Sequence, residues 1–130
     1  MKLDIVFPGG KKVDVLYHGF RIQSDQPVED GGENSAPSPY DLFLSSIAAC
    51  AGYYVIAFCA QRGISSEGLK MTMNCEKNIE TRTIGKIDIA IKLPAGFPDK
   101  YKNAVVKAAE SCGVKKHFVY PPVFSIFIES

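Results

Sequence analysis

The sequence predicts an α+β domain in which antiparallel strands pack against one long apolar helix. Three observations lead to this fold class. The longest apolar run of the chain, SPYDLFLSSIAACAGYYVIAFCAQRG, occupies residues 38–63. On both sides of this run, apolar and polar residues alternate with a period of two, as they do in half-buried strands. A later stretch has helical spacing. The expected order is βββ-α-ββ-α-β, in a single domain over residues 1–130.

Length and charge limit the kinds of protein that this chain can be. With 130 residues, of which 46% are hydrophobic, the chain can bury one modest core. Fifteen basic and fourteen acidic side chains leave a net charge of +1, which offers no electrostatic attraction to nucleic acid or to an acidic membrane surface. The start, MKLDIVFPGG, lacks the apolar region of a signal peptide, so we expect a cytoplasmic protein.

Three short strands are expected before the long helix. Alternating apolar residues at 3–7 and 13–15 flank the turn Pro8-Gly9-Gly10, which is the pattern of a hairpin. A second turn at His18-Gly19 returns the chain through a third strand at Phe20–Gln23. The next residues, up to Pro37, are rich in Asp, Gly, Glu and Pro, and we interpret them as a loop that leads to the helix.

The ends of the long helix are marked by capping residues. Ser38 suits the N-cap, Pro39 the first helical position, and Asp41 the carboxylate of a capping box. Gly63 suits the left-handed residue just past the C-terminus. Between these signals, residues 42–60 leave no face suited to water, so the helix must be buried in a core or in a bilayer.

A membrane-spanning helix is the alternative, because residues 42–60 are close in number to the ~20 apolar residues that cross a bilayer. The flanking strands favour a core helix, since their apolar faces need covering and this helix is the only element large enough to cover them. We therefore expect no membrane partner and, from the charge balance, no nucleic-acid partner.

The clearest periodicity in the chain predicts two strands after the long helix. Apolar residues occupy every second position from Leu69 to Cys75 and again from Ile87 to Leu93. A second helix is expected from Pro98 to Gly113, because its apolar residues recur at i, i+3, i+4 and i+7. Alternating apolar residues over 124–128 predict a final strand.

Four cysteines in a chain without a signal peptide are more typical of free, catalytic or redox-active thiols than of a disulfide framework. No C-x-x-C pair occurs, and His18 and His117 stand alone, so no structural zinc site is expected. Cys50 is flanked by alanines and a glycine, which leaves room for another atom to approach its sulfur. The same neighbours suit a small buried hydrophobic residue, and the sequence supports both interpretations equally.

The other three cysteines differ in their positions. Cys59 lies on the opposite face of the long helix from Cys50, so these two cannot pair within it. Cys75 occupies an apolar strand position, as a core residue does. Cys112 lies in the last turn of the expected second helix, beside the charged segment 115–117. Cys50 and Cys112 are therefore the pair to consider for thiol chemistry.

A reactive Cys50 needs a nearby cation, because burial disfavours the thiolate. Of the three arginines, Arg62 is at the wrong end of the long helix and Arg82 lies in a distal turn. We expect Arg21 to serve, oriented by a carboxylate such as Asp41. Arg21 is equally consistent with an ordinary surface charge on an edge strand, and Asp41 with a plain helix cap.

The segment GGENSAPSPYDLFLSSIAAC, residues 31–50, carries a family resemblance. With its A-A-C in the long helix and a second cysteine on the next helix, the chain resembles the OsmC family, which includes the organic hydroperoxide resistance proteins. The residue after the helix-opening proline is Tyr40, where the hydroperoxide resistance branch has a glutamate. The acid at Asp41 resembles a broader and less characterised branch.

The resemblance implies an intertwined homodimer whose two long helices are wrapped by sheets, with paired sites at the subunit interface. It also implies a peroxidase in which the Cys50 thiolate attacks the O–O bond of an organic hydroperoxide and becomes a sulfenic acid. Cys112 resolves this acid to a disulfide, which an external dithiol reduces. No metal, haem, flavin or other cofactor is required. An apolar pocket that favours organic or lipid hydroperoxides is expected to be lined by Phe43, Ile47, Tyr53 and Tyr54.

Two other functions would use the same residues. A non-enzymatic protein would bind a small apolar or thiol-reactive molecule in the same cleft without consuming peroxide. A redox sensor would form the disulfide but regain its thiols too slowly for turnover. The sequence contains no DNA-binding element that would connect a sensor to transcription.

Overall fold

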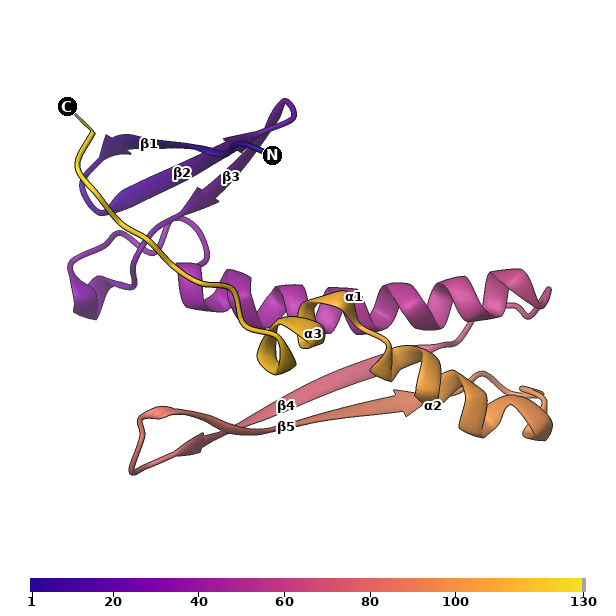
Figure 1. Ribbon diagram of the computed structural model, residues 1–130. Helices are drawn as coiled ribbons and strands as arrows, with labels where there is room; N and C mark the ends of the chain where they lie inside the picture. Colours follow the sequence, from indigo (N-terminus) through magenta and orange to yellow (C-terminus); the bar gives the residue numbers. More distant parts are fainter. Residues whose placement is uncertain (130) are drawn as a thin grey trace. The chain divides into compact units, whose positions relative to one another are not determined.

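The computed structural model describes residues 1–129 and has the predicted α+β fold, with antiparallel sheets and a long central helix (Figure 1). The chain divides into two compact units, residues 1–45 and the residues from 46 onwards. The division falls within helix α1 (Pro39–Gln61), so this helix begins in the first unit and ends in the second.

The first unit carries a three-stranded antiparallel sheet of β1 (Asp4–Gly9), β2 (Lys12–Tyr17) and β3 (Phe20–Ser24), in that order (Figure 1). Gly9 and Gly10 make the first turn with φ values of 143° and 58°, a region that glycine enters without strain. His18 and Gly19 make the second turn, also at positive φ. The three strands predicted before the helix are confirmed.

One face of this sheet is apolar and exposed. The register places Ile5, Val15 and Ile22 side by side, and alternation along the strands puts Phe7 and Phe20 on the same face. Phe7 is 78% exposed and Phe20 is 70% exposed. Contiguous apolar surface of this kind marks an interaction site in soluble proteins.

The loop between β3 and α1, which includes the short helix η1 (Val28–Asp30), is folded around the carboxylate of Asp25. Asp25 is buried and accepts hydrogen bonds from the Gln26 N–H at 2.8 Å, the Glu33 N–H at 3.3 Å, and both the N–H and Oγ of Ser35 at 3.1 and 2.6 Å. These bonds, above all those from Ser35, lower the pKa of Asp25 to about 2. The loop is therefore held by a buried charge with a full set of donors.

Two further contacts fix the path of this loop. A Cβ at Gly32 would lie 1.9 Å from the carbonyl oxygen of Gln26, so only glycine fits there. The Asp25 N–H donates to the carbonyl oxygen of Pro37 at 3.2 Å, which ties the start of the loop to its end. The chain thus enters α1 from a fixed position.

Helix α1 begins and ends where its capping residues predict. The Ser38 N–H donates to Asp41 Oδ2 at 3.0 Å and the Asp41 N–H donates to Ser38 Oγ at 3.2 Å, which completes a capping box. The bonds with Ser38 lower the pKa of Asp41. At the other end, Gly63 has a φ of 64°, and the Ile64 N–H donates to the carbonyl oxygen of Cys59 at 2.9 Å.

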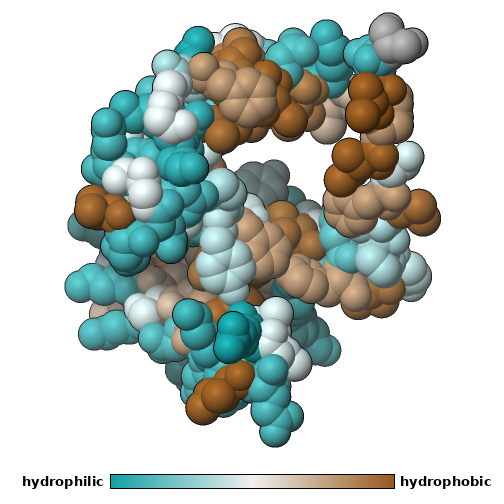
Figure 2. Space-filling model, turned by 90° about the vertical axis from the view of Figure 1, so that its left-hand side faces the viewer, coloured by the Kyte–Doolittle hydropathy of each residue, from teal (hydrophilic) through white to brown (hydrophobic). Residues whose placement is uncertain are grey.

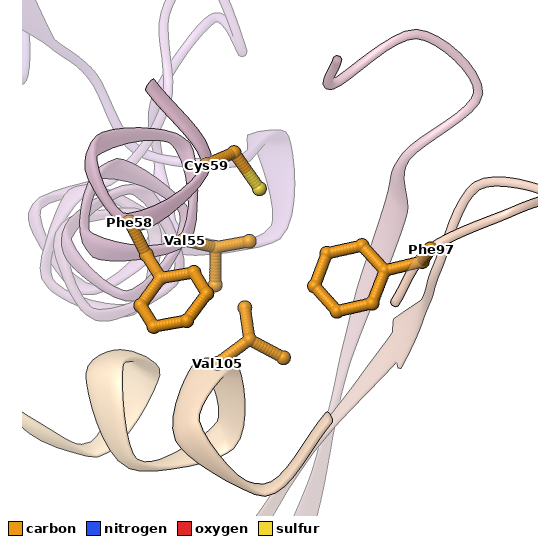
Figure 3. Close-up of a cluster of buried hydrophobic side chains, with 5 residues drawn as sticks. All are labelled: Val55, Phe58, Cys59, Phe97 and Val105. Carbon is orange, nitrogen blue, oxygen red and sulfur yellow. The ribbon is translucent and has the colours of Figure 1, made fainter. Parts of the chain in front are cut away.

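Within the described residues, α1 buries one stripe of side chains at helical spacing, made up of Ile47, Ala51, Val55, Phe58 and Cys59. The last three meet Phe97 and Val105 in the core of the second unit (Figure 3). By length and composition α1 would also suit a membrane. Its buried stripe makes it a core helix, as predicted.

The second unit contains the antiparallel hairpin of β4 (Lys70–Asn78) and β5 (Thr83–Lys92). The register pairs Met71 with Ile91 and Met73 with Ile89, so the predicted apolar residues share a face. Met71 and Ile91 pack against the core. Cys75 is exposed, and the prediction that it fills the core is wrong because β4 is uncovered from residue 74 onwards.

The second predicted helix is interrupted. A short η2 (Asp99–Tyr101) leads into α2 (Lys102–Glu110), and α3 (Gly113–Val119) follows after two residues. The chain leaves the helical conformation at Cys112, whose φ and ψ are −51° and 121°. Gly113 therefore begins α3 instead of ending one longer helix, and the placement of Cys112 within a last helical turn is wrong. The apolar face of α2 packs on the core as predicted.

The strand predicted over residues 124–128 is not formed, because residues 121–129 have neither helix nor strand. Phe124 is 83% exposed, and Ile126 and Ile128 are each 97% exposed. Figure 2 shows apolar side chains on the surface at this end of the chain. A strand needs the edge of another strand to satisfy its backbone groups, and within residues 1–129 no strand pairs with this segment.

Candidate functional site

Cys50 lies near the middle of α1 among small side chains. Its thiol is partly buried. Ala51 is packed inside the unit, whereas a Cβ placed at Gly52 would meet no atom within 4 Å. Open space therefore adjoins α1 at Gly52, on nearly the opposite side of the helix from Cys50.

The structure brings Cys50 into contact with Cys112 and with the start of α3. The Cys112 thiol and the backbone N–H groups of Val114 and Gly113 form hydrogen bonds with the Cys50 sulfur. These bonds lower the pKa of Cys50, while partial burial acts in the opposite direction. Backbone N–H groups at the start of α3 therefore help to stabilise the Cys50 thiolate.

The pKa of Cys112 shifts in the opposite direction, upwards. It is 1% exposed, and this burial raises the pKa of its thiol. Its hydrogen bond to Cys50 adds to the rise, and the N–H groups of Lys115 and Val114 offset it only in part. Burial and hydrogen bonding therefore favour the thiolate form at Cys50 over the thiolate form at Cys112.

This arrangement permits two successive steps of thiol chemistry. A thiolate is the nucleophilic form of cysteine, so Cys50 can attack an electrophile. The adjoining thiol of Cys112 can then attack the modified sulfur and close a disulfide. All four cysteines are free thiols here, which is the reduced state of such a pair. Within residues 1–129, no group of three His, Cys, Asp or Glu side chains is placed to hold a metal ion.

Arg21 and Asp41, the other predicted site residues, have partners within the first unit. Arg21 Nη1 lies 2.6 Å from Asp14 Oδ2, and Asp14 is 3% exposed. The carboxylate that orients Arg21 is therefore Asp14, whereas the carboxylate of Asp41 caps α1.

Sequence reasoning missed Asp14. The signal was present in the predicted hairpin, where Arg21 pairs with Leu16 and is a diagonal neighbour of Asp14 on the same face.

The sequence analysis also did not predict the backbone N–H donors at the start of α3. The sequence offered a signal, since Val114 and Phe118 are spaced i, i+4 after Gly113. A glycine at this position is also typical of a helix end, and the sequence alone does not show that Gly113 begins a second helix. A cysteine directly before a helix start faces free N–H groups, because the first four have no partner within the helix.

The second unit has a cavity of about 650 Å³ bounded by β5, α2 and α3, with Ile47 contributed by α1. Of the four residues predicted to line a pocket, Ile47 does so. Phe43 belongs to the first unit, where its ring stacks on Tyr40. Tyr53 and Tyr54 pack edge to face, with ring centroids 5.3 Å apart, and are not among the described residues that line this cavity.

Solved structures with low sequence identity share this fold. A protein from Psychrobacter arcticus 273-4, described as an osmotic stress induced and detoxification response protein, gives a TM-score of 0.75 at 22% identity, over 89% of this chain and 86% of that one. An OsmC like protein from Mycoplasma pneumoniae gives 0.67 at 15% identity, over 92% and 88%. An organic hydroperoxide resistance protein OsmC from Legionella pneumophila gives 0.55 at 23% identity, over 91% and 89%. The class of fold is that of the OsmC-like proteins.

The sequence itself supports the same conclusion. A model of the OsmC-like protein family matches residues 32–126, which is most of the chain. The chain belongs to the OsmC family, as the motif before Cys50 predicted. No curated protein matches it.

Proposed function

We propose that this protein is a thiol peroxidase that reduces organic hydroperoxides, with Cys50 as the peroxidatic cysteine and Cys112 as the resolving cysteine. One observation carries the proposal: the two thiols are hydrogen-bonded, the pKa of Cys50 is lowered and that of Cys112 is raised. Membership of the OsmC family supports the substrate class, since a structural relative is described as an organic hydroperoxide resistance protein.

The reaction has three steps. The Cys50 thiolate attacks the terminal oxygen of the hydroperoxide, the O–O bond breaks, and Cys50 becomes a sulfenic acid while the alkoxide takes up a proton and leaves as an alcohol. The sulfur of Cys112 then attacks the sulfenic sulfur, and a disulfide forms with release of water. An external dithiol reduces this disulfide by exchange and is itself oxidised. The scheme needs no metal or organic cofactor.

Arg21 and Asp41 have supporting roles in the proposal. The guanidinium of Arg21, oriented by Asp14, stabilises negative charge on the reacting sulfur or oxygen in the assembled protein. Asp41 fixes the start of α1, the helix that carries Cys50. Phe43, Tyr53 and Tyr54 join Ile47 as apolar contacts for the organic part of the substrate.

The working form that we propose is a homodimer in the reducing environment of the cytoplasm. Exposed apolar side chains support an interface between two copies. They occur on the sheet of the first unit, on α1, where Tyr53 is 64% and Ile56 is 55% exposed, and in the C-terminal segment. Monomeric proteins seldom leave this much apolar surface in water.

A thiol count tests the proposal. Fully reduced protein receives one equivalent of cumene hydroperoxide, and its cysteines are mapped by peptide mass spectrometry. The expected result is rapid formation of a Cys50–Cys112 disulfide, with Cys59 and Cys75 still reduced. Slow or indiscriminate oxidation of all four thiols would show that the pair is not peroxidatic.

Two variants complete this test. Cys50→Ser should abolish peroxide turnover with dithiothreitol as the reductant. Cys75→Ser is the matched control, because it makes the same change at an exposed thiol on the hairpin and should retain turnover. Turnover in the Cys50→Ser variant would exclude Cys50 as the attacking thiol.

The cavity favours a second candidate, a non-enzymatic binder of apolar molecules. Its volume of about 650 Å³ lies within the range of small-molecule sites, roughly 300–1,000 Å³. Such a binder would be stabilised by an apolar ligand and would be indifferent to loss of Cys112. Peroxide consumption that depends on Cys112 distinguishes the enzyme from the binder.

A further inference from the structure

The peptide group between Gly113 and Val114 forms hydrogen bonds on both of its sides. Its N–H, which belongs to Val114, is bonded to the sulfur of Cys50. Its carbonyl oxygen, which belongs to Gly113, lies 2.9 Å from Nδ1 of His117. One peptide group thus joins the imidazole ring of His117 to the reactive thiol.

The carbonyl oxygen decides which ring nitrogen of His117 carries a proton. A carbonyl oxygen can only accept a hydrogen bond, so Nδ1 must be the donor. This requires either the neutral ring with its proton on Nδ1 or the imidazolium, and both forms direct an N–H at the oxygen of Gly113. The bond can therefore form whether the ring is neutral or charged.

The place of this bond matters because Gly113 follows the break between α2 and α3. Cys112 is outside the helical conformation, and Gly113 is the first residue of α3. Glycine has more backbone freedom than any other residue, and a Cβ at Gly113 would meet no atom within 4 Å. The bond from His117, one helical turn further along α3, therefore restrains a peptide group that would otherwise be free to turn.

A hydrogen bond to the oxygen of a peptide group also makes its N–H a stronger donor. Oxygen and nitrogen are conjugated through the C–N bond, so a donor at the oxygen draws electron density away from the N–H. Such cooperative strengthening is on the order of 10–30% per bond. Here the strengthened donor is the Val114 N–H, which is bonded to the sulfurs of both Cys50 and Cys112. The thiolate gains more than a neutral thiol, and burial disfavours the thiolate at Cys112.

We infer that His117 is a positioning residue for Cys50, because its Nδ1–H holds and polarises the peptide group whose other side donates to the Cys50 sulfur. The inference rests on the proposed function only in taking Cys50 as the reacting thiol. His117 acts through the Gly113–Val114 peptide group and transfers neither oxygen nor a proton to the substrate. Loss of the Nδ1–H donor therefore lowers the fraction of Cys50 thiolate at neutral pH.

Two substitutions at one position separate the donor from the rest of the side chain. His117→Asn keeps an N–H donor close to the place of Nδ1, whereas His117→Leu keeps a similar bulk and removes every side-chain donor. Alkylation of Cys50 by iodoacetamide, followed on the Cys50 peptide, gives the rate at pH 7 and the midpoint of the pH profile. His117→Leu should react about two- to fivefold more slowly than wild type, with its midpoint at higher pH, as expected when one hydrogen bond is weakened. His117→Asn should stay close to wild type.

A double-mutant cycle shows whether His117 acts through this peptide group. Val114→Pro removes the N–H, so His117→Leu should cause no further slowing in that background. The charged side chains on the elements that meet α3 at the cavity, Lys86, Glu110 and Lys115, are the same in all these variants. Undiminished slowing by His117→Leu in the Val114→Pro background would overturn the inference. Equal rates and midpoints in His117→Leu and His117→Asn would overturn it as well, because only one of them has the donor.

Failure of the inference and failure of the peroxidase proposal can be told apart, because iodoacetamide reports the thiolate whether or not the protein reduces peroxides. Consumption of cumene hydroperoxide by wild type tests the peroxidase proposal. Alkylation of Cys50 that depends on the His117 donor, without any consumption of peroxide, would refute the peroxidase proposal and support the inference. Consumption of peroxide with unchanged alkylation in His117→Leu would overturn the inference alone.

Discussion

Cys50 and Cys112 carry the same functional group, yet their pKa values move in opposite directions. Cys50 accepts hydrogen bonds from a thiol and from two backbone N–H groups, and each bond stabilises its thiolate. Cys112 is buried more deeply and donates to an anion, so it retains its proton. The two residues are therefore not interchangeable, and Cys50 is the better suited of the two to act as a nucleophile.

Cys112→Ala should raise the pKa of Cys50, because the variant loses the S–H donor that contributes most to lowering it. Cys112→Ser retains an O–H donor and should stay closer to wild type. The pH dependence of Cys50 alkylation by iodoacetamide, followed on the Cys50 peptide, gives the midpoint for each protein. Identical midpoints in all three would show that the hydrogen bond between the thiols does not tune Cys50.

The sequence alone identified some residues of the candidate site and missed others. Cys50 and Cys112 were singled out because small neighbours and a charged segment are visible in the sequence. Asp14 was missed because its partner Arg21 becomes a neighbour only through strand pairing. An ion pair between neighbouring strands depends on their register, and the alternation of apolar residues alone does not reveal it.

The start of α3 is the element that tunes the thiol pair. Its first N–H groups have no helical partners, and they are directed at two sulfurs. A negative charge is favoured at this end of a helix by the alignment of its peptide dipoles as well as by the hydrogen bonds. The chemistry of Cys50 therefore depends on where α2 ends and α3 begins.

Val114→Pro should weaken the thiolate of Cys50, because proline has no N–H to donate and is tolerated in the first turn of a helix. Alkylation of Cys50 at pH 7 should become about two- to tenfold slower, the effect of losing one hydrogen bond worth roughly 0.5–1.5 kcal/mol. Val114→Ala keeps the N–H and serves as the control. Equal alkylation rates in the two variants would mean that this N–H does not act on Cys50.

The loop around Asp25 should make stability depend on pH. The folded pKa of about 2 lies below the ordinary value of 3.8, so the hydrogen bonds to this carboxylate stabilise the protein above about pH 4. That contribution is lost as the pH falls from about 4 toward 2. Tm measured by circular dichroism should fall in this window for wild type.

Asp25→Asn provides the comparison for the pH effect. Its Tm at pH 7 should be lower than that of wild type, and its Tm should change less between pH 4 and pH 2. Glu29→Gln, an exposed acid of the same loop, should behave like wild type. Parallel Tm curves for Asp25→Asn and wild type across the window would show that Asp25 does not set the acid response.

Among the elements, those with local signals were predicted and those that depend on distant partners were not. The caps of α1 at Ser38, Asp41 and Gly63 and the alternation of β4 and β5 are local, and the structure agrees with them. The break at Cys112 depends on one ψ angle that apolar spacing does not encode. The strand expected over 124–128 has the right alternation, but no strand edge within residues 1–129 pairs with it.

At the scale of the whole molecule, large apolar side chains remain exposed in three regions of the chain. The sheet of the first unit, one side of α1 and the C-terminal segment all expose large apolar side chains. Sequence analysis located these residues correctly as apolar faces. The sequence does not show that these faces stay uncovered in a single chain. An apolar face has the same periodicity whether its own chain or a second chain buries it.

Ile126→Asp should weaken the proposed homodimer, since it places a charge in the exposed apolar C-terminal segment. Ile79→Asp is the matched control, with the same change at a 91% exposed isoleucine in the turn between β4 and β5. Sedimentation velocity over a range of concentrations gives the oligomeric state of each protein. Dimers of equal stability in both variants would remove the C-terminal segment from the interface.

The distance along the chain between Cys50 and α3 has a consequence for the protein during its own synthesis. Cys50 leaves the ribosome well before Cys112, Gly113 and Val114, the three residues whose donors lower its pKa. The fraction of thiolate governs how fast a cysteine reacts, so a nascent chain carries an ordinary thiol at this position. The low pKa of Cys50 therefore develops only when residues 112–114 have folded against α1.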